Sequence, residues 1–183
     1  GCASLSLASN AEKFPNHNFE VVEFTNYPDP LDHIWGFWHM PWLCEPFNIS
    51  RERWCKWKII TINKNIMLET ERYPYCAIHR YKWINYCKEK SKASGVKFSL
   101  NKSFRMSEQV LDSRSPRSVP GSIIQHFLGQ EIISNEEIFD PSAVTLMDFR
   151  CDQSKGLHFI YVLPFSRKTA LVESTIFSKS MVN

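Results

Sequence analysis

The last third of the chain carries three short runs of apolar residues, at positions 144–150, 159–166 and 170–178. Each run is rich in β-branched and aromatic residues, which favour strands. Polar segments typical of turns separate the runs, at 152–156 and at 166–169. This pattern predicts an antiparallel meander of three strands.

The first half of the chain alternates between helical and strand patterns. The first residues look like part of a dinucleotide-binding fingerprint, whose helix would run over 1–7, and the apolar run at 19–24 predicts the strand after it. Apolar positions recur at helical spacing over residues 80–92, opposite a face of lysines. Gly95 is expected to end this helix, and residues 96–100 are expected to form the next strand. The fold class predicted is α/β (α+β), with an antiparallel sheet.

Two carboxylates fall within the predicted meander. Because side chains alternate along a strand, Glu173 shares a face with Leu171 and Thr175. Asp148 shares a face with Arg150. A carboxyl on an apolar face is costly to ionise and therefore keeps its proton more readily near neutral pH. This indicates Glu173 as a candidate acid catalyst, and Asp148 as a second candidate or as a partner paired to Arg150. The structural alternatives are an exposed strand glutamate and, for Asp148, a surface ion pair with Arg150.

Composition narrows the class of protein. The chain has 183 residues, 43% of them hydrophobic, which is enough for one domain or two small ones. The net charge of +3 is mild and the 22 basic residues are spread out, so a nucleic-acid partner is not expected. The six cysteines include no CxxC pair, which favours reduced, buried thiols. A zinc site from His39, Cys44 and Cys55 would lack closely spaced ligand pairs, and no metal is expected.

Aromatic residues gather in the segment 34–47, which carries few charges. Neither this segment nor any other run of the sequence approaches the roughly 20 apolar residues of a membrane span. Such an aromatic segment either dips into a bilayer surface, covers an apolar pocket or simply covers the core. Trp35, Phe37 and Trp38 are therefore candidates for substrate contact.

The first residues look like the second half of a dinucleotide-binding fingerprint, whose glycines let a pyrophosphate approach the start of a helix. Gly1 would be the middle glycine, and Ser4 replaces the third. Glu23 lies near the end of the following strand, where an acid roughly 20 residues further on binds a ribose hydroxyl. A small-residue helix followed by a strand is also common in proteins that bind no nucleotide.

Several blocks, in order along most of the chain, resemble the lycopene cyclase family of carotenoid-making bacteria. The blocks are WGFW at 35–38 with Asp32 before it, VLDSR at 110–114, QHFLG at 125–129 with Glu131, FDP at 139–141, LMDFR at 146–150, YVLPFS at 161–166 and LVEST at 171–175.

The resemblance implies a two-domain, flavin hydroxylase-like flavoprotein. Residues 1–115 would form a partial Rossmann-like FAD-binding domain, and residues 116–183 part of an antiparallel substrate-binding sheet. The implied cofactor is FAD, reduced by NADPH. The implied substrate is lycopene or a related linear carotenoid, met by a cytoplasmic protein at the membrane surface. The implied reaction is acid-catalysed closure of the lycopene ends to β-ionone rings, without net redox change.

The resemblance also implies residue roles. Glu173 occupies the position of the family's essential glutamate, and Ser174 stands where plant relatives have a second acid. Glu131 follows the family's pattern loosely, because Gln130 replaces the usual Trp, and it is expected at the substrate tunnel. The block around Asp112 would be a strand that brings this carboxylate to the flavin, unless Asp112 only caps a loop.

The chain departs from the family in two places. The family has a longer stretch between the strand at 96–100 and the block at 110–114, and it continues beyond the acidic strand. The chain is therefore expected to be a fragment or a shortened copy. Two alternative functions stay open. One is an inactive carotenoid- or lipid-binding remnant. The other is a flavin-dependent monooxygenase of the same fold, which would need no acid at Glu173 and would consume NAD(P)H and oxygen.

Overall fold

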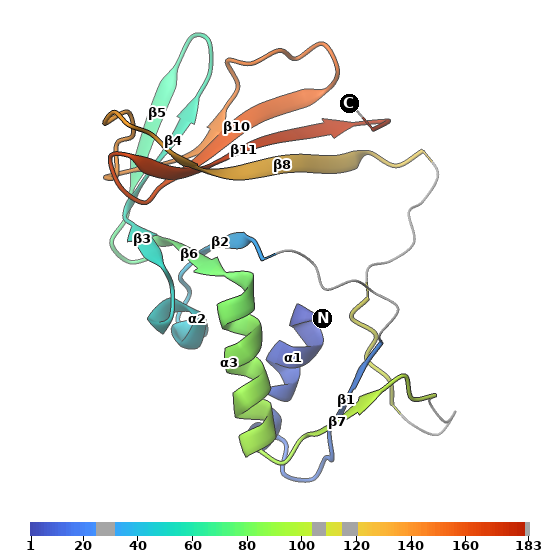
Figure 1. Ribbon diagram of the computed structural model, residues 1–183. Coiled ribbons are helices and arrows are strands. Elements are labelled where there is room, and N and C mark those ends of the chain that lie inside the picture. The colour runs from blue at the N-terminus through green and yellow to red at the C-terminus, as the bar shows by residue number, and fades with distance from the viewer. Residues whose placement is uncertain (25–31, 104–108, 115–120, 182–183) are drawn as a thin grey trace. The chain divides into compact units, whose positions relative to one another are not determined.

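The computed structural model describes residues 1–24, 32–103, 109–114 and 121–181 (Figure 1). The chain divides into two compact units: Gly1–Trp35 with Ile78–Arg117, and Gly36–Ala77 with Ser118–Asn183. This division differs from the contiguous one expected from the sequence, because residues 36–77 join the C-terminal sheet. Two of its strands come from this segment.

Within its described residues, the first unit has two α-helices, one short 3-10 helix and a pair of parallel strands. Its elements are α1 (Cys2–Ala8), the short 3-10 helix η1 (Ala11–Lys13), β1 (Glu20–Glu23), α3 (Arg80–Ala93) and β7 (Lys97–Leu100). β1 and β7 pair in parallel, with Glu20 opposite Lys97. These elements confirm the helices and strands predicted for this part of the chain.

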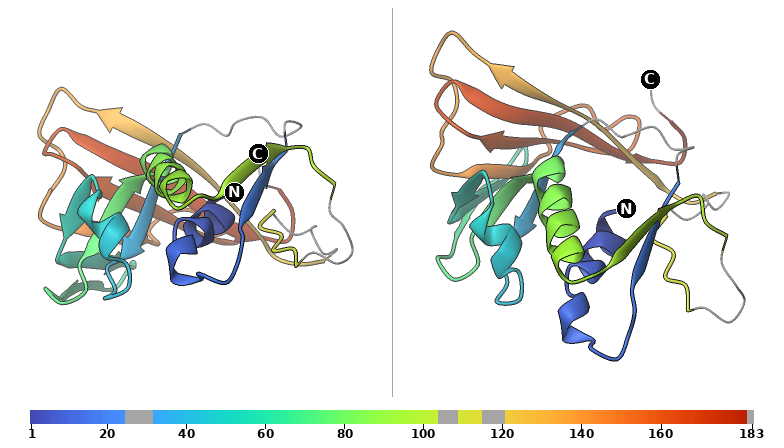
Figure 2. Two further views of the ribbon diagram at one scale, coloured as in Figure 1. Left: turned by 90° about the horizontal axis from the view of Figure 1, so that it is seen from below. Right: turned by 60° about the horizontal axis from the view of Figure 1, so that its bottom comes forward.

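Helical spacing builds the core of the first unit. Leu5 and Ala8 lie on one face of α1, and Ile84 and Cys87 lie on one face of α3. The two helices pack side by side, as Figure 2 also shows. Gly95 adopts a φ of +76° just after α3, a conformation that glycine adopts without strain, so this helix ends where the sequence predicted.

The second unit is built on a six-stranded sheet. Its strands are β4 (Lys56–Ile60), β5 (Asn65–Glu69), β8 (Ile124–Ile133), β9 (Val144–Asp148), β10 (Leu157–Pro164) and β11 (Thr169–Ser178). They are ordered β5-β4-β9-β10-β11-β8, and the orange and red strands lie side by side in Figure 1. The antiparallel meander β9–β10–β11 confirms the prediction. β8 adds a fourth antiparallel strand beside β11, and β4 lies parallel to β9.

The strand register assigns each carboxylate to a face of this sheet. Tyr161 lies opposite Glu173, and Glu173 lies opposite Gly129. The face that carries Glu173, named here the acid face, also carries the buried Leu163 and Leu171.

Three further strands, β2 (Ile34–Trp38), β3 (Glu52–Trp54) and β6 (Tyr75–His79), form a small sheet ordered β2-β6-β3. The short helix α2 (Cys44–Asn48) precedes β3. All six cysteines are free. Among the described residues, no helix is long and apolar enough to cross a bilayer.

Candidate functional site

Glu173 is half-buried on the acid face, and its two carboxyl oxygens have different surroundings. Thr175, which is only 1% exposed, donates a hydrogen bond from its hydroxyl to Oε1 at 2.8 Å. Oε2 lies beside Gly129, where a Cβ would stand 3.4 Å from it. One oxygen is therefore held in place, and the other faces a position with no side chain.

Two tyrosines, the buried Tyr75 and the half-buried Tyr161, lie next to this carboxylate. The hydroxyl of Tyr161 lies 2.9 Å from that of Tyr75, which comes from β6. Burial raises the pKa of both phenols, and the nearby Glu173 carboxylate raises it further. A Cβ on Gly36 would overlap both hydroxyls, so this close packing requires glycine. The phenols stay neutral at physiological pH and form a fixed wall beside Glu173.

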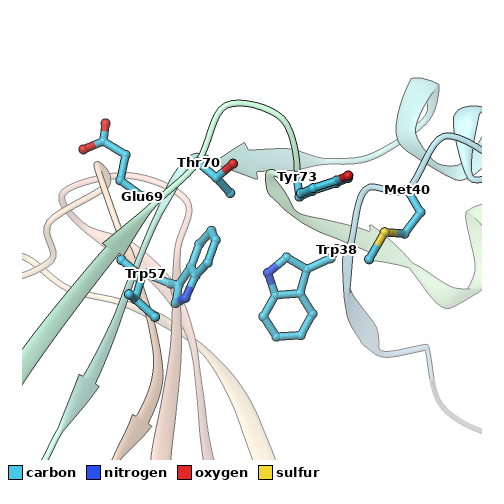
Figure 3. Close-up of a pocket in the computed structure, with 7 residues that line it drawn as sticks. Trp38, Met40, Trp57, Glu69, Thr70 and Tyr73 are labelled. Atoms are coloured by element: carbon cyan, nitrogen blue, oxygen red, sulfur yellow. The ribbon is translucent and has the colours of Figure 1, made fainter.

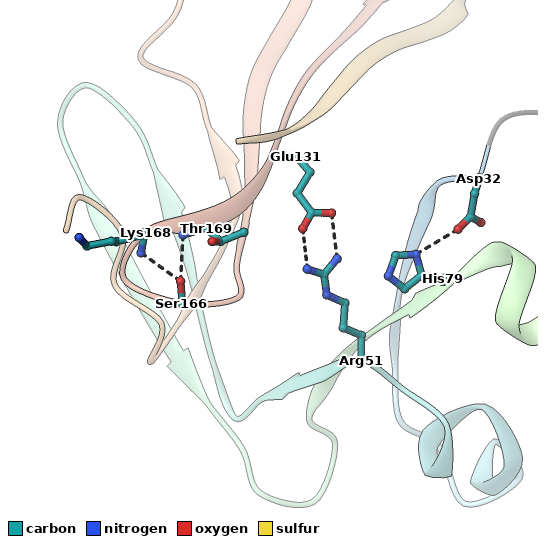
Figure 4. A network of polar contacts seen from close by, with 7 residues as sticks. All are labelled: Asp32, Arg51, His79, Glu131, Ser166, Lys168 and Thr169. Carbon is teal, nitrogen blue, oxygen red and sulfur yellow. Dashed lines mark hydrogen bonds and ion pairs between the residues drawn. The ribbon is translucent and has the colours of Figure 1, made fainter. Parts of the chain in front are cut away.

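Glu131 lies on the acid face, opposite Leu171 on β11. It forms a bidentate ion pair with Arg51, with distances of 2.9 Å from Nη1 to Oε2 and 2.5 Å from Nη2 to Oε1 (Figure 4). The Arg51 guanidinium also lies 3.7 Å above the centre of the Phe165 ring. Glu131 thus connects β8 to the segment before β3, and both of its carboxyl oxygens bind Arg51.

Asp148 projects from the face opposite Glu173, because it pairs with Ile160 and Ile160 pairs with Ser174. Arg150 binds it through Nε at 2.9 Å and Nη2 at 2.6 Å. This guanidinium holds the pKa of Asp148 below its ordinary value. Asp148 is therefore paired to Arg150, as both the partner role and the surface ion pair expected from the sequence require, and its side chain lies on the face opposite Glu173.

The aromatic residues of β2 separate onto its two sides. Trp38 meets Tyr75 edge-on at 4.8 Å between ring centres and Trp57 at 6.1 Å. Phe37 lies on the other side of the strand by alternation, as does Trp35. The indole of Trp35 donates to Nε2 of His33 at 2.8 Å. Trp38 also lines a pocket together with Trp57.

In the first unit, Gly1 begins α1 and the hydroxyl of Ser4 donates to its carbonyl at 2.9 Å. A Cβ on Gly1 would stand 3.2 Å from Oγ of Ser113. The block at 110–114 therefore passes beside the fingerprint glycine. The described residues 109–114 form neither helix nor strand, so the strand predicted there is wrong.

The two acids expected at the nucleotide are both ion-paired. Asp112 accepts hydrogen bonds from the backbone N–H of Arg114 at 3.0 Å and from its guanidinium, which together lower the pKa of Asp112 to about 2. This local turn explains why no strand forms there. Glu23 ends β1 and binds Lys88 of α3 at 2.8 Å.

Asp32, which precedes the WGFW block, caps a helix. Its Oδ1 accepts from the backbone N–H of Tyr81 at 2.9 Å in the first turn of α3, and its Oδ2 lies 3.1 Å from Nδ1 of His79 (Figure 4). Burial raises the pKa of Asp32, but these hydrogen bonds outweigh it and leave the pKa lowered. The role of Asp32 is therefore to position α3.

The sequence reasoning missed several residues around Glu173. Tyr161 stands in the block at 161–166, and its alternation with the buried Phe159 and Leu163 could have placed it on the acid face. Arg51 and Tyr75 come from distant parts of the chain and gave no local signal.

Comparison with known families finds a match in the C-terminal part of the chain. A family described as "Lycopene cyclase protein" matches residues 106–182, the part that carries β8 to β11. No curated protein matches the chain.

Solved structures match nearly the whole chain at low identity. A 2-methyl-3-hydroxypyridine-5-carboxylic acid oxygenase has a TM-score of 0.59 at 14% identity, over 98% of this chain and 57% of that one. A geranylgeranyl bacteriochlorophyll reductase-like protein from Thermoplasma acidophilum has a TM-score of 0.60 at 12% identity, over 98% and 54%. A flavin-dependent brominase has a TM-score of 0.55 at 14% identity, over 96% and 53%.

The chain thus spans little more than half the length of these relatives. Its fold is the predicted Rossmann-like α/β flavoprotein fold, and its resemblance to the lycopene cyclase family is confirmed over residues 106–182.

Proposed function

We propose that this chain carries the acid-bearing sheet of a lycopene β-cyclase-type isomerase, which closes the ends of lycopene to β-ionone rings. The observation that carries the proposal is the setting of Glu173. This residue lies in the stretch that matches the lycopene cyclase family, on the acid face, with Oε1 held by Thr175 and Oε2 beside Gly129.

The reaction needs an acid and an apolar, electron-rich surrounding. Glu173 donates a proton from Oε2 to a terminal double bond, an internal double bond attacks the resulting carbocation, and loss of a proton sets the alkene of the ring. Tyr161 and Tyr75 exclude water on one side of the acid. Aromatic faces nearby favour a positive charge by about 0.5–2 kcal/mol each. No electron is gained or lost overall.

FAD, reduced by NADPH, is the proposed cofactor. Three residues of the first unit would hold the dinucleotide: Gly1 at the start of α1, Ser113 against this glycine, and Glu23 at the end of β1. Asp112 would lie near the same group through its neighbour Ser113. Bound reduced flavin supplies electron density that favours a nearby positive charge. The cyclase is proposed to work in the cytoplasm at the membrane surface, because its substrate resides in lipid.

The test compares two single carboxylate deletions in bacteria that accumulate lycopene. Glu173→Gln removes the acid, and Asp148→Asn removes a carboxylate from the same sheet on its opposite face. Ringed carotenoids are expected from the parent and from Asp148→Asn, but not from Glu173→Gln. Rings formed by Glu173→Gln at the parental level would show that another group is the acid.

A flavin-dependent monooxygenase is the second candidate, since an oxygenase is among the solved structures that share the fold. Such an enzyme would consume NAD(P)H and oxygen in step with product, whereas the cyclase would consume neither stoichiometrically. The third candidate is an inactive carotenoid- or lipid-binding remnant. Unchanged lycopene beside well-expressed, folded parent protein would favour this remnant.

A further inference from the structure

A second site lies in the same unit as the acid, at the other end of the sheet. It is a pocket of about 410 Å³, near the lower end of the roughly 300–1,000 Å³ typical of ligand sites. The residues that line it are Trp38, Met40, Trp57, Leu68, Glu69, Thr70 and Tyr73. Figure 3 shows the indoles of Trp38 and Trp57 beside each other, and their planes are nearly perpendicular.

Strand register places the floor of this pocket on the acid face. Leu68 of β5 lies opposite Trp57 of β4, and Trp57 lies opposite the buried Val144 of β9. The same row continues through Leu163 to Leu171, two residues from Glu173. The pocket and the acid therefore open onto one surface of the sheet.

The polar groups at the rim already have partners. Glu69 forms an ion pair with Lys56 at 3.5 Å, and Oγ1 of Thr70 accepts from the backbone N–H of Arg72 at 3.2 Å. The Arg72 guanidinium lies 5.1 Å from the centre of the Tyr73 ring. The charge of Glu69 is thus already neutralised by Lys56, and the Tyr73 ring is already in contact with a cation. The pocket therefore favours an uncharged, apolar ligand group over a charged one.

The pocket is remote from the proton donor. Three strand spacings separate β4 from β11, or roughly 14 Å at 4.8 Å each. The contacts from Trp38 to Tyr75 and from Tyr75 to Tyr161 connect the two places. A ligand whose reacting end lies at Glu173 would therefore reach this pocket only with a distant part of an extended chain.

We propose that this pocket binds an uncharged, apolar chain segment of the substrate, away from its reacting end. This inference deepens the proposed cyclase function. It rests on that function only where it identifies the bound apolar segment as part of a polyene. Binding at the pocket and ring closure at Glu173 are measured separately. A negative result for one therefore does not imply a negative result for the other.

The probe is diphenylhexatriene, an uncharged conjugated rod, titrated into the purified chain with tryptophan excitation. Saturable binding with energy transfer from tryptophan is expected. Leu68→Ser is expected to weaken it about tenfold, since the side chain loses its apolar contact. Met67→Ser is the matched control: Met67 is 48% exposed against 44% for Leu68, on the same strand but its opposite face.

A second pair of variants controls for loss of binding through misfolding. Trp38→Ala should weaken binding, whereas Trp42→Ala, at a residue that is 77% exposed and outside the pocket, should not. Thermal unfolding of each variant shows whether it is folded. Equal affinity in Leu68→Ser and Met67→Ser, or displacement of the probe by tetramethylammonium, would overturn the proposal. Saturable, Leu68-dependent binding by a chain that leaves lycopene unchanged would support the pocket and contradict the cyclase.

Discussion

At Glu173, the hydroxyl of Thr175 fixes one carboxyl oxygen while the bare backbone of Gly129 leaves space beside the other. Alternation along the strand was enough to predict that Glu173 and Thr175 share a face. The role of Gly129 was not predictable, because it lies on a strand that the sequence did not reveal.

Thr175→Val tests whether the hydroxyl positions the acid. Valine keeps the shape but removes the hydrogen bond to Glu173, so ring formation is expected to fall about tenfold, the rate equivalent of roughly 1.5 kcal/mol. Thr175→Ser keeps the hydroxyl and should restore most of the activity with little change in KM. The measurement is ring formation per folded protein. A serine variant as poor as the valine variant would argue that Thr175 serves packing alone.

Gly36→Ala tests the close packing of the two tyrosine hydroxyls. The added methyl group overlaps both, so a loss of about 1–3 kcal/mol in the free energy of unfolding is expected. Gly129→Ala is the matched control, since its Cβ would meet its nearest neighbour at 3.4 Å, an ordinary contact. Urea unfolding measures both variants. Equal stability of the two would mean that the tyrosine pair moves aside without cost.

The ion pair between Asp148 and Arg150 makes the stability of the fold depend on pH in the acidic range. Because Arg150 lowers the pKa of the folded carboxyl below its ordinary 3.8, the pair stabilises the protein above that pH. The stabilisation is lost as the pH falls through the folded pKa. Asp148→Asn should therefore reduce stability near neutral pH by up to about 1 kcal/mol and flatten the acid side of the profile. The measurement is the free energy of unfolding in urea as a function of pH, for parent and variant. Profiles of the same shape, separated by a constant, would contradict this expectation.

At the scale of elements, local pattern predicted the helices and the meander but not the partners added to it. β4 lies parallel to β9, more than 80 residues later in the chain, so this pairing leaves no local signature. β8 is mostly exposed, and its mixture of polar and apolar residues shows no clean alternation. It is a strand because ten residues of β11 pair with it. At Asp112, by contrast, a local side-chain turn prevailed over the expected strand.

Ser174→Pro tests how far the sheet depends on β11. This strand is paired on both sides, by β10 and β8, so proline removes a ladder hydrogen bond and clashes with a neighbour. A loss of about 3 kcal/mol or more is expected in thermal or urea unfolding. Ser174→Thr keeps the hydroxyl that lies 2.8 Å from Nε2 of His158 and should be tolerated. Similar stability of the two variants would contradict the central place of β11.

At the scale of the whole molecule, the second unit draws on two separate stretches of the chain. Residues 36–77 supply Gly36, Arg51 and Tyr75, while the C-terminal strands supply Tyr161 and Glu173. A domain boundary inferred along the sequence could not show this, because the aromatic segment 34–47 has the same composition whether it covers a nucleotide-binding unit or a sheet. The C-terminal stretch was recognisable because several short blocks occur there in the family's order.

The most direct test of acid catalysis is ring closure by the purified chain, supplied with lycopene and with FAD reduced by NADPH, in D₂O. Protonation of the terminal double bond by solvent-exchanged Glu173 predicts one deuterium retained per ring, by mass spectrometry. NADPH and oxygen should not be consumed in step with product. An oxygenated product, or rings formed without deuterium, would contradict the account.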